Sequence, residues 1–293
     1  MFTGSRVQPQ LASTARPALG KQAGQANLDR MDAPVRLPTL FLSHGSPMLA
    51  IEDSPAGRFL DGLGGQLPWP RAIVVASAHF TTEQPALGGH PEPRTMHDFG
   101  GFPARLYRIR YPAPGDPDLA EQIAKRFADA GFAAEVRGDQ GLDHGVWVPL
   151  RRMYPQADIP VVPLSVMPHA DAARHFALGQ ALAALRDHGV LVIGSGGFVH
   201  NLGDLDRRQP DVPPTPWAAE FGAWMHRCIA AGEWPTLLEW HHLAPHARRA
   251  HPTVEHLMPL FVALGAAGEA PKVRTIHRSH QFGSLALDAF AFD

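Results

Sequence analysis

Short apolar runs recur along the chain from Pro38 onwards, and amphipathic segments lie between them. Several of these runs are continuous and rich in β-branched residues, which is typical of strands buried on both faces of a sheet. The runs that we predict to be β-strands span residues 39–43, 72–78, 133–137, 159–166 and 190–195. Buried strands of this kind favour a largely parallel sheet.

Four segments carry apolar residues at spacings of three and four, which predicts α-helices. They span residues 118–131, 171–189, 215–232 and 253–268. Asp171 stands where an N-cap is expected and Gly189 where a helix commonly ends, so the second helix has both boundaries marked. Thr215 and Thr253 occupy the first positions of the third and fourth helices, where a hydroxyl can cap.

The alternation of strands and helices predicts an α/β fold. We expect a single domain with a central, largely parallel or mixed β-sheet flanked by helices, and a site at the C-terminal ends of the strands. The composition does not change between residues 36 and 293, so we expect one domain over that range. Residues 1–35 are rich in Gln, Ala, Pro and Gly and lack apolar periodicity, which predicts a disordered N-terminal tail.

The overall composition narrows the classes of protein. Hydrophobic residues make up 45% and charged residues 18% of the chain, and the formal net charge is −2 with histidine neutral. This charge creates no field that would attract nucleic acid or an anionic membrane surface. Cys228 is the single cysteine, so an intramolecular disulfide is excluded and a cytoplasmic location is favoured. We expect small-molecule partners, and a homo-oligomer is also compatible with this composition.

Four histidines stand near the ends of predicted elements. His44, His79 and His200 each close an apolar run, and His256 lies within the predicted helix 253–268. The ligand crevice of an α/β sheet opens at its strand ends, and imidazole is the commonest protein ligand of transition metals. The chain holds 17 histidines, so any one of the four alone is better explained by a local hydrogen bond. Together, with Gly and Ser neighbours that let a ligand approach, they predict a metal centre.

Local motifs support this interpretation. In SHGSP at 43–47, Gly45 permits a tight bend that would set His44 at the crevice, although a plain β-turn has the same signature. His144 stands at a predicted helix start, where an imidazole can donate to a bound anion or simply occupy the first turn. Two glycines precede His200, so the backbone there can approach a ligand closely.

Taken in order, these motifs resemble the class III extradiol ring-cleavage dioxygenases, and within them the 4,5-DOPA dioxygenase type, which includes zinc-containing bacterial members. The motifs that carry the resemblance are SHGSP, SAHF, TMHDFGGFP, LYRIRYPAPG, LDHGVWVPL, a Gly-rich turn with VHNL, HPTVEHLMPL and the late GSLAL. The resemblance covers residues 36–293, which would form a catalytic extradiol dioxygenase-like domain, and it leaves only the tail outside.

The resemblance also implies roles for particular residues. Carried over by position, it implies that His44, His79 and His256 hold a divalent metal. It implies that His200 is a general acid–base or a fourth metal ligand, and that His144 contacts bound dioxygen or substrate. The residues expected to bind substrate are Ser46, Phe80 and Asn201.

The expected ligand set is entirely histidine. Iron-containing ring-cleaving relatives typically use two histidines and one carboxylate, so the resident metal is left open between Zn(II) and Fe(II). Glu255 is the carboxylate that could take a ligand position. It is adjacent to His256 in a predicted helix, so the two side chains would face different directions and only one of them could easily point at a metal.

The activity that the resemblance implies is metal-dependent cleavage of a catechol, such as 3,4-dihydroxyphenylalanine or a related aromatic diol, with both atoms of dioxygen incorporated. His200, with an ordinary pKa of about 6.5, would take and return the proton. A three-histidine site with an open position also suits a zinc-dependent hydrolase, with Glu255 or Asp143 as base. A metal-containing binding protein without turnover is the third alternative.

Overall fold

The structure is a computed structural model that describes residue 1, residues 36–208 and residues 212–293. The predicted N-terminal tail therefore lies outside the described residues, apart from Met1. The described chain from Arg36 onwards forms one compact unit. Among the described residues, none of the helices is long and apolar enough to cross a bilayer.

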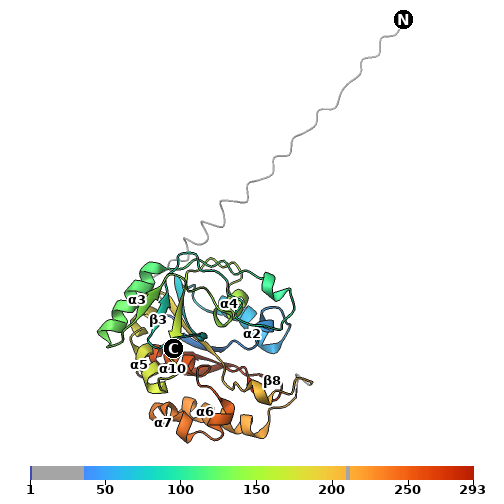
Figure 1. Ribbon diagram of the computed structural model, residues 1–293, viewed down its shortest axis with the longest axis vertical. Helices are drawn as coiled ribbons and strands as arrows, with labels where there is room; N and C mark the ends of the chain where they lie inside the picture. Colours follow the sequence, from blue (N-terminus) through green and yellow to red (C-terminus); the bar gives the residue numbers. More distant parts are fainter. Residues whose placement is uncertain (2–35, 209–211) are drawn as a thin grey trace. The chain divides into compact units, whose positions relative to one another are not determined.

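A β-sheet with helices around it forms the centre of the fold (Figure 1). It is an eight-stranded mixed sheet with the strand order β4-β3-β5-β2-β6-β1-β10-β7. Its strands are β1 (Thr39–Ser43), β2 (Ala72–Thr81), β3 (Ala86–Gly88), β4 (Glu135–Arg137), β5 (Val161–Val166), β6 (Val190–Gly196), β7 (Val273–His277) and β10 (Ala289–Phe292). The four central strands β5, β2, β6 and β1 are mutually parallel, whereas β10 pairs antiparallel with β1 and β7 antiparallel with β10. The predicted α/β class and mixed sheet are confirmed.

Helices cover both faces of this sheet. The α-helices are α2 (Pro55–Leu63), α3 (Pro117–Asp129), α4 (His144–Met153), α5 (Ala172–Gln180), α6 (Pro216–Ala231), α7 (Trp234–Leu238), α8 (Trp240–Leu243), α9 (Ala247–Ala250) and α10 (Met258–Ala267). Short 3-10 helices are η1 (Pro47–Ala50), η2 (Gly64–Gln66), η3 (Leu106–Arg108), η4 (Ala183–His188) and η5 (Leu202–Asp204), and β8 (His280–Gln281) pairs with β9 (Leu285–Ala286).

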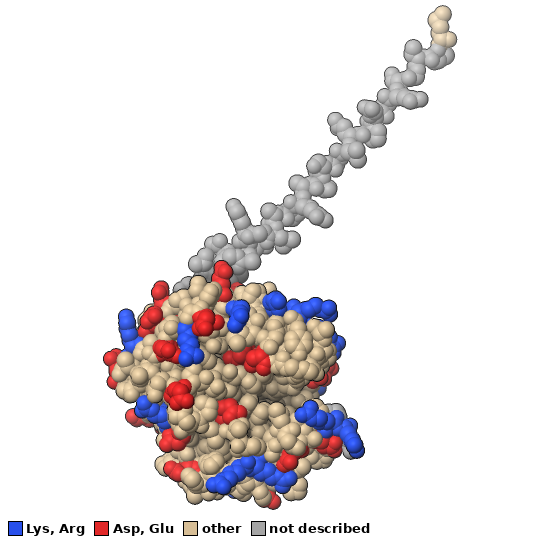
Figure 2. Space-filling model, viewed as in Figure 1, with Lys and Arg blue, Asp and Glu red and all other residues tan. Residues whose placement is uncertain are grey.

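Alternation along the strands decides which helices lie on which face. Val75 of β2 packs with residues of α2 and α4, and its neighbour Val74 packs with residues of α3 and α5. Every residue of α10 is buried, as expected for a helix that is apolar on all sides. On the face shown in Figure 2, acidic and basic side chains are interspersed, in keeping with the small net charge.

The predicted helix 171–189 is shorter than expected. Asp171 caps it as predicted, accepting from the Arg174 backbone N–H, but α5 ends at Gln180 and the second half winds as the 3-10 helix η4. In that tighter turn the side chain of Arg186 is buried, and it donates to backbone carbonyls of Leu37, Ala267 and Phe292. Tertiary hydrogen bonds therefore accompany the departure from regular α-helix.

The predicted helix 253–268 was wrong at its start. The helix α10 begins at Met258, and residues 252–257 form a turn. Pro259 explains this, because proline has no N–H and is favoured in the first turn of a helix. Thr253 consequently does not cap the helix but donates to Glu255, and Thr215, although at the N-cap of α6, makes no capping hydrogen bond.

A buried histidine, His175, should make the folding stability of this protein depend on pH. Its side chain is fully buried, with Nδ1 donating to the Asp171 carbonyl and Nε2 accepting from the Met167 backbone N–H. Burial lowers the pKa of His175 to about 4. The folded pKa lies below the unfolded value, so the unfolded chain takes up the proton first. Folding stability should fall as pH decreases from about 6.5 to 4, by up to about 1.4 kcal/mol per pH unit for this residue.

The variant His175→Gln should lose less stability over that pH interval than the parent. Urea unfolding at several pH values measures the slope. His242→Gln, at an exposed histidine, is the matched control and should keep the parental slope. Equal slopes for His175→Gln and the parent would show that His175 does not contribute to the acid sensitivity.

Candidate metal centre and cavity

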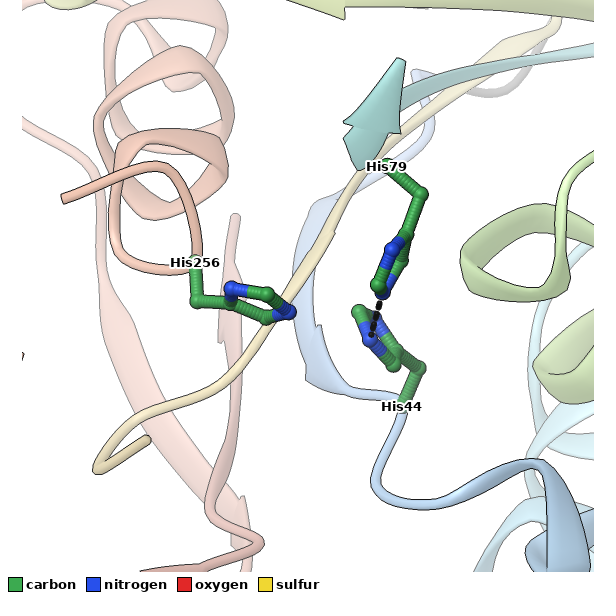
Figure 3. Close-up of side chains that lie close together, drawn as sticks. All are labelled: His44, His79 and His256. Carbon is green, nitrogen blue, oxygen red and sulfur yellow. Dashed lines mark hydrogen bonds between the residues drawn. The ribbon is translucent and has the colours of Figure 1, made fainter. Parts of the chain in front are cut away.

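Three histidines from distant parts of the chain converge at the C-terminal ends of the central strands (Figure 3). His44 follows β1, His79 lies near the end of β2, and His256 lies in the turn that precedes α10. One nitrogen atom from each ring lies within 4.8 Å of the other two. Because β1 and β2 both pair with β6 in parallel, their carboxyl ends meet at one edge of the sheet.

Two local features place these rings. The pairing of β2 with β5 is irregular between Ser77 and Thr81, and such a bulge re-aims the side chains beside it, here His79. The turn that carries His256 lies against the end of β6, where a Cβ on Gly196 would be 2.1 Å from the His256 carbonyl oxygen. Only glycine allows this approach, so the role of this glycine is close packing of backbone.

The hydrogen bonds of His44 define its tautomer. Its Nδ1 lies 3.1 Å from Ser195 Oγ, and that hydroxyl donates its proton to the Gly145 carbonyl. The hydroxyl oxygen must therefore accept from His44, which places the ring proton on Nδ1 and leaves a lone pair on Nε2. That lone pair faces the other two histidines.

The hydrogen bonds of His256 indicate the same tautomer, with the proton on Nδ1 and the lone pair on Nε2. Its Nδ1 donates to the Glu255 carboxylate at 2.9 Å, and its Nε2 is buried without a hydrogen-bond partner among the described residues. Burial acts to raise the pKa of Glu255, but hydrogen bonds from His256 and Thr253 outweigh it and hold the pKa at about 2. Glu255 is therefore an ionised partner on the outer side of His256. The expectation that the two side chains face different directions assumed a helix, whereas both residues lie in a turn.

The contact between His44 and His79 brings two nitrogen atoms together in a buried setting. Their Nε2 atoms are 3.0 Å apart, and two lone pairs at that distance require a proton or a cation between them. Burial, followed by the neighbouring histidines, lowers the pKa of both rings, that of His79 to about 3. Neutral imidazoles and the unpartnered His256 Nε2 are the donor set that a divalent transition metal binds, so these residues fit such an ion.

A carboxylate that the sequence interpretation did not single out lies beside this cluster. Asp98 accepts hydrogen bonds from both the backbone N–H and the Nδ1 of His144, and its Oδ2 is 3.6 Å from His79 Nδ1. Burial acts to raise the pKa of Asp98, but hydrogen bonding to His144 lowers it below its usual range. Asp98 belongs to the motif TMHDFGGFP, yet nothing in the local pattern distinguishes it from other acidic residues.

The ring of His200 lies against that of His256. The two rings are stacked with centroids 3.4 Å apart and an angle of 7° between their planes. Burial, followed by the nearby histidines, lowers the pKa of His200 to about 2, so the expected value near 6.5 was wrong. His200 stands outside the three rings whose nitrogens converge, and its ring makes no hydrogen bond with another described residue.

The cluster forms the floor of a cavity of about 390 Å³, a size that suits a small organic ligand. The lining includes all five of these histidines and the expected residue Ser46. The walls are otherwise mainly apolar and include Met48, Phe99, Phe102, Val199, Leu202, Leu205, Phe282 and Leu285. Such apolar walls suit the nonpolar part of a small organic ligand.

Two residues expected to bind substrate do not line this cavity. Phe80 follows His79 on β2, so its side chain points to the other face, where Arg137 lies over the ring. Asn201 uses both ends of its amide on backbone, donating to the Arg249 carbonyl and accepting from the Gly203 N–H. It therefore holds the loop at η5 in place, and neither residue is retained as a substrate contact.

Beyond the histidines, two charged residues also line the cavity: Glu52 and Arg207. Neither side chain forms an ion pair or hydrogen bond with any other residue in the described ranges. As far as the described residues show, these two opposite charges at one cavity are available to a ligand.

The fold and this site define an α/β protein with a histidine-rich centre at the ends of its strands. The chain matches the family model described as the catalytic LigB subunit of aromatic ring-opening dioxygenase over residues 38–286. It therefore belongs to this family and is a class III extradiol dioxygenase, an enzyme, as the motifs predicted. The family is metal-dependent, in agreement with the donor set described above.

Similar proteins agree with this assignment. The chain is 44% identical over 258 residues to the 4,5-DOPA dioxygenase extradiol of Beta vulgaris, covering 87% of this chain and 96% of that protein. It is 40% identical over 257 residues to the protein of the same name from Escherichia coli strain K12, covering 86% and 93%. The crystal structure of an uncharacterized Escherichia coli K12 protein superposes with a TM-score of 0.74 at 34% identity, covering 88% of this chain and 100% of that one.

Proposed function

We propose that this enzyme cleaves the ring of a catechol, such as 3,4-dihydroxyphenylalanine or a related aromatic diol, using dioxygen and a divalent metal held by His44, His79 and His256. The observation that carries this proposal is the convergence of three imidazoles on the floor of a cavity of ligand size, one of them with a buried Nε2 that has no hydrogen-bond partner among the described residues. Either Zn(II) or Fe(II) suits imidazole ligands, and Fe(II) is the metal that we expect to support turnover.

When bound, the metal would supply Lewis acidity and a meeting point for the diol and dioxygen. The chain's own residues would bind, orient and move protons around it. The apolar walls exclude water from the ring, and His200 and His144 flank the floor of the cavity, within the group of residues that a bound diol would face. His200 lines the cavity and would accept a proton from a diol hydroxyl at a ring nitrogen and later return it, for which its lowered pKa must rise towards neutrality once the diol is bound.

The hydrolase alternative is not favoured, because its base would have to face the cavity. Glu255 is bound to His256 on the outer side of the ring. Asp143 is buried and accepts from Ser77 Oγ and the Val146 backbone N–H as the N-cap of α4. Neither carboxylate is among the residues that line the cavity.

Replacing His44, His79 or His256 by alanine should reduce bound metal to a small fraction, because a three-ligand site rarely tolerates the loss of one ligand. The measurement is metal per chain after loading with Zn(II) or Fe(II) and dialysis, and oxygen uptake with a catechol after anaerobic Fe(II) loading. His90→Ala, at an exposed histidine, is the control. Full metal in the His256 variant would overturn the ligand assignment.

Glu255→Ala should weaken metal affinity by roughly 10- to 100-fold, because His256 would lose the partner that orients its ring.

His200→Gln should retain metal and diol binding while turnover falls by roughly 10²–10⁴-fold, the range for losing a general acid–base. The stacked position of His200 on His256 leaves the converging nitrogens untouched, so the metal should remain. Metal content and the dissociation constant of the diol are measured beside turnover. A fall in metal content that parallels the loss of activity would identify His200 as a fourth ligand.

The charges of Glu52 and Arg207 at the cavity favour a diol with a charged side chain. In 3,4-dihydroxyphenylalanine the side chain carries a carboxylate, which Arg207 would bind, and an ammonium group, which Glu52 would bind. With the diol directed to the floor, the charged groups would lie toward these two side chains, and the apolar walls would enclose the ring.

Arg207→Ala should lower kcat/KM for 3,4-dihydroxyphenylalanine and 3,4-dihydroxyphenylacetate by roughly three- to tenfold, about 1 kcal/mol, as expected for a partly exposed charge pair. Glu52→Gln should lower kcat/KM by a similar factor for 3,4-dihydroxyphenylalanine and dopamine. Both variants should treat the uncharged 4-methylcatechol as the parent does. Arg208→Ala, at an exposed neighbour, is the control. Equal losses on all four catechols would show that the two charges do not select the side chain.

A further inference from the structure

We propose that Asp98 is a positioning residue that fixes the tautomer of His144 and turns its Nε2 lone pair toward the cavity. Its consequence for turnover rests on the proposed function, whereas the tautomer itself does not. The two residues are 46 positions apart in the sequence and meet only in the folded chain.

One carboxylate holds both the backbone and the ring of the same histidine. Asp98 Oδ1 accepts the His144 backbone N–H at 2.9 Å, and Oδ2 accepts from His144 Nδ1 at 2.9 Å. The first bond fixes the carboxylate relative to the start of α4, and the second fixes the ring relative to the carboxylate. Two such bonds leave the imidazole little freedom to turn about its side-chain torsions.

The acceptor determines which ring nitrogen carries the proton. An ionised carboxylate accepts only, so His144 Nδ1 must donate, and a neutral His144 then has its lone pair on Nε2. His144 lines the cavity, 3.8 Å from the His79 ring and 5.4 Å from the His44 ring between centroids. The ring of Phe99 meets it at 90°, so packing limits its rotation as well.

The segment that carries Asp98 is tied to the beginning of α4 by backbone hydrogen bonds. Met96 N–H donates to the Leu142 carbonyl at 2.7 Å, and Leu142 N–H donates to the Arg94 carbonyl at 2.8 Å. The indole of Trp147, one turn into α4, donates to the Met96 carbonyl at 2.8 Å. These bonds set the distance between Asp98 and His144 independently of the side-chain contact between them.

The same feature distinguishes His144 from His200. Both rings line the cavity. Of these two, His144 donates to an acceptor that fixes its orientation, whereas the ring of His200 has no hydrogen-bond partner among the described residues. A proton-transfer histidine is commonly oriented in this way by a third group. Asp98 is also 3.6 Å from His79 Nδ1, so action through the metal ligand is the competing explanation, which the experiment must separate.

The tautomer can be measured without turnover. ¹⁵N chemical shifts of histidine side chains in the Zn(II)-loaded protein, with His144→Gln to assign the signal, should show His144 protonated at Nδ1. In Asp98→Asn the amide nitrogen can face Nδ1, and the proton should move wholly or partly to Nε2. Glu255→Gln is the matched control, because it alters the partner of His256 and should leave the His144 signals unchanged. An Nε2–H tautomer in the parent, or an unchanged one in Asp98→Asn, overturns the proposal.

A double-mutant cycle separates the two routes of action. Asp98→Asn should lower kcat by roughly 10²–10⁴-fold with little change in KM or metal content, as expected when a histidine presents the wrong tautomer. In the His144→Gln background it should add less than about twofold, because coupled residues are not additive. A loss of metal, or an equal loss of kcat in both backgrounds, would show that Asp98 acts through His79 and overturn the proposal. If the parent cleaves no catechol, the proposed function fails while the tautomer measurement still decides the role of Asp98.

Discussion

The centre of this enzyme depends on how closely the end of β6 approaches the turn before α10. A Cβ on Gly194 would lie 2.0 Å from the Pro259 carbonyl oxygen, and one on Gly196 would lie 2.1 Å from that of His256. The Gly197 N–H donates to the His256 carbonyl at 2.8 Å, so the approach is also held by a hydrogen bond. Without this contact of backbone on backbone, His256 could not reach the two histidines at the ends of β1 and β2.

Around that contact, three of the five histidines that line the cavity donate a hydrogen bond from the outer ring nitrogen. Ser195 accepts from His44, Glu255 from His256 and Asp98 from His144. Such outer partners fix ring orientation and tautomer, and they make the ligand nitrogen a better donor to a metal. Burial also lowers the pKa of His44, because it removes the solvent that would stabilise the protonated ring.

The helix α4 links this centre to the wall of the cavity. Its N-terminus carries His144, and near its C-terminus Arg151 donates to the Ala50 carbonyl while Arg152 donates to the carbonyls of Leu49 and Glu52. The helix α4 therefore positions both His144, at the floor of the cavity, and the segment 49–52, which carries Glu52. A change in the way α4 packs would alter the floor and the rim of the cavity together.

The sequence by itself determined the α/β class, the central parallel strands and the family, because apolar periodicity and the ordered motifs are local properties. It also singled out all five histidines that line the cavity. Two features followed from local rules that the sequence analysis did not apply: Pro259 moved the start of α10 beyond His256, and strand alternation turned Phe80 away. Tertiary structure decided the rest. Backbone pairing of Met96 with Leu142 brought Asp98 to His144, and the approach of β6 to the turn of His256 brought the three rings together. These outcomes depend on contacts between residues far apart in the chain, and a local pattern carries no record of such contacts.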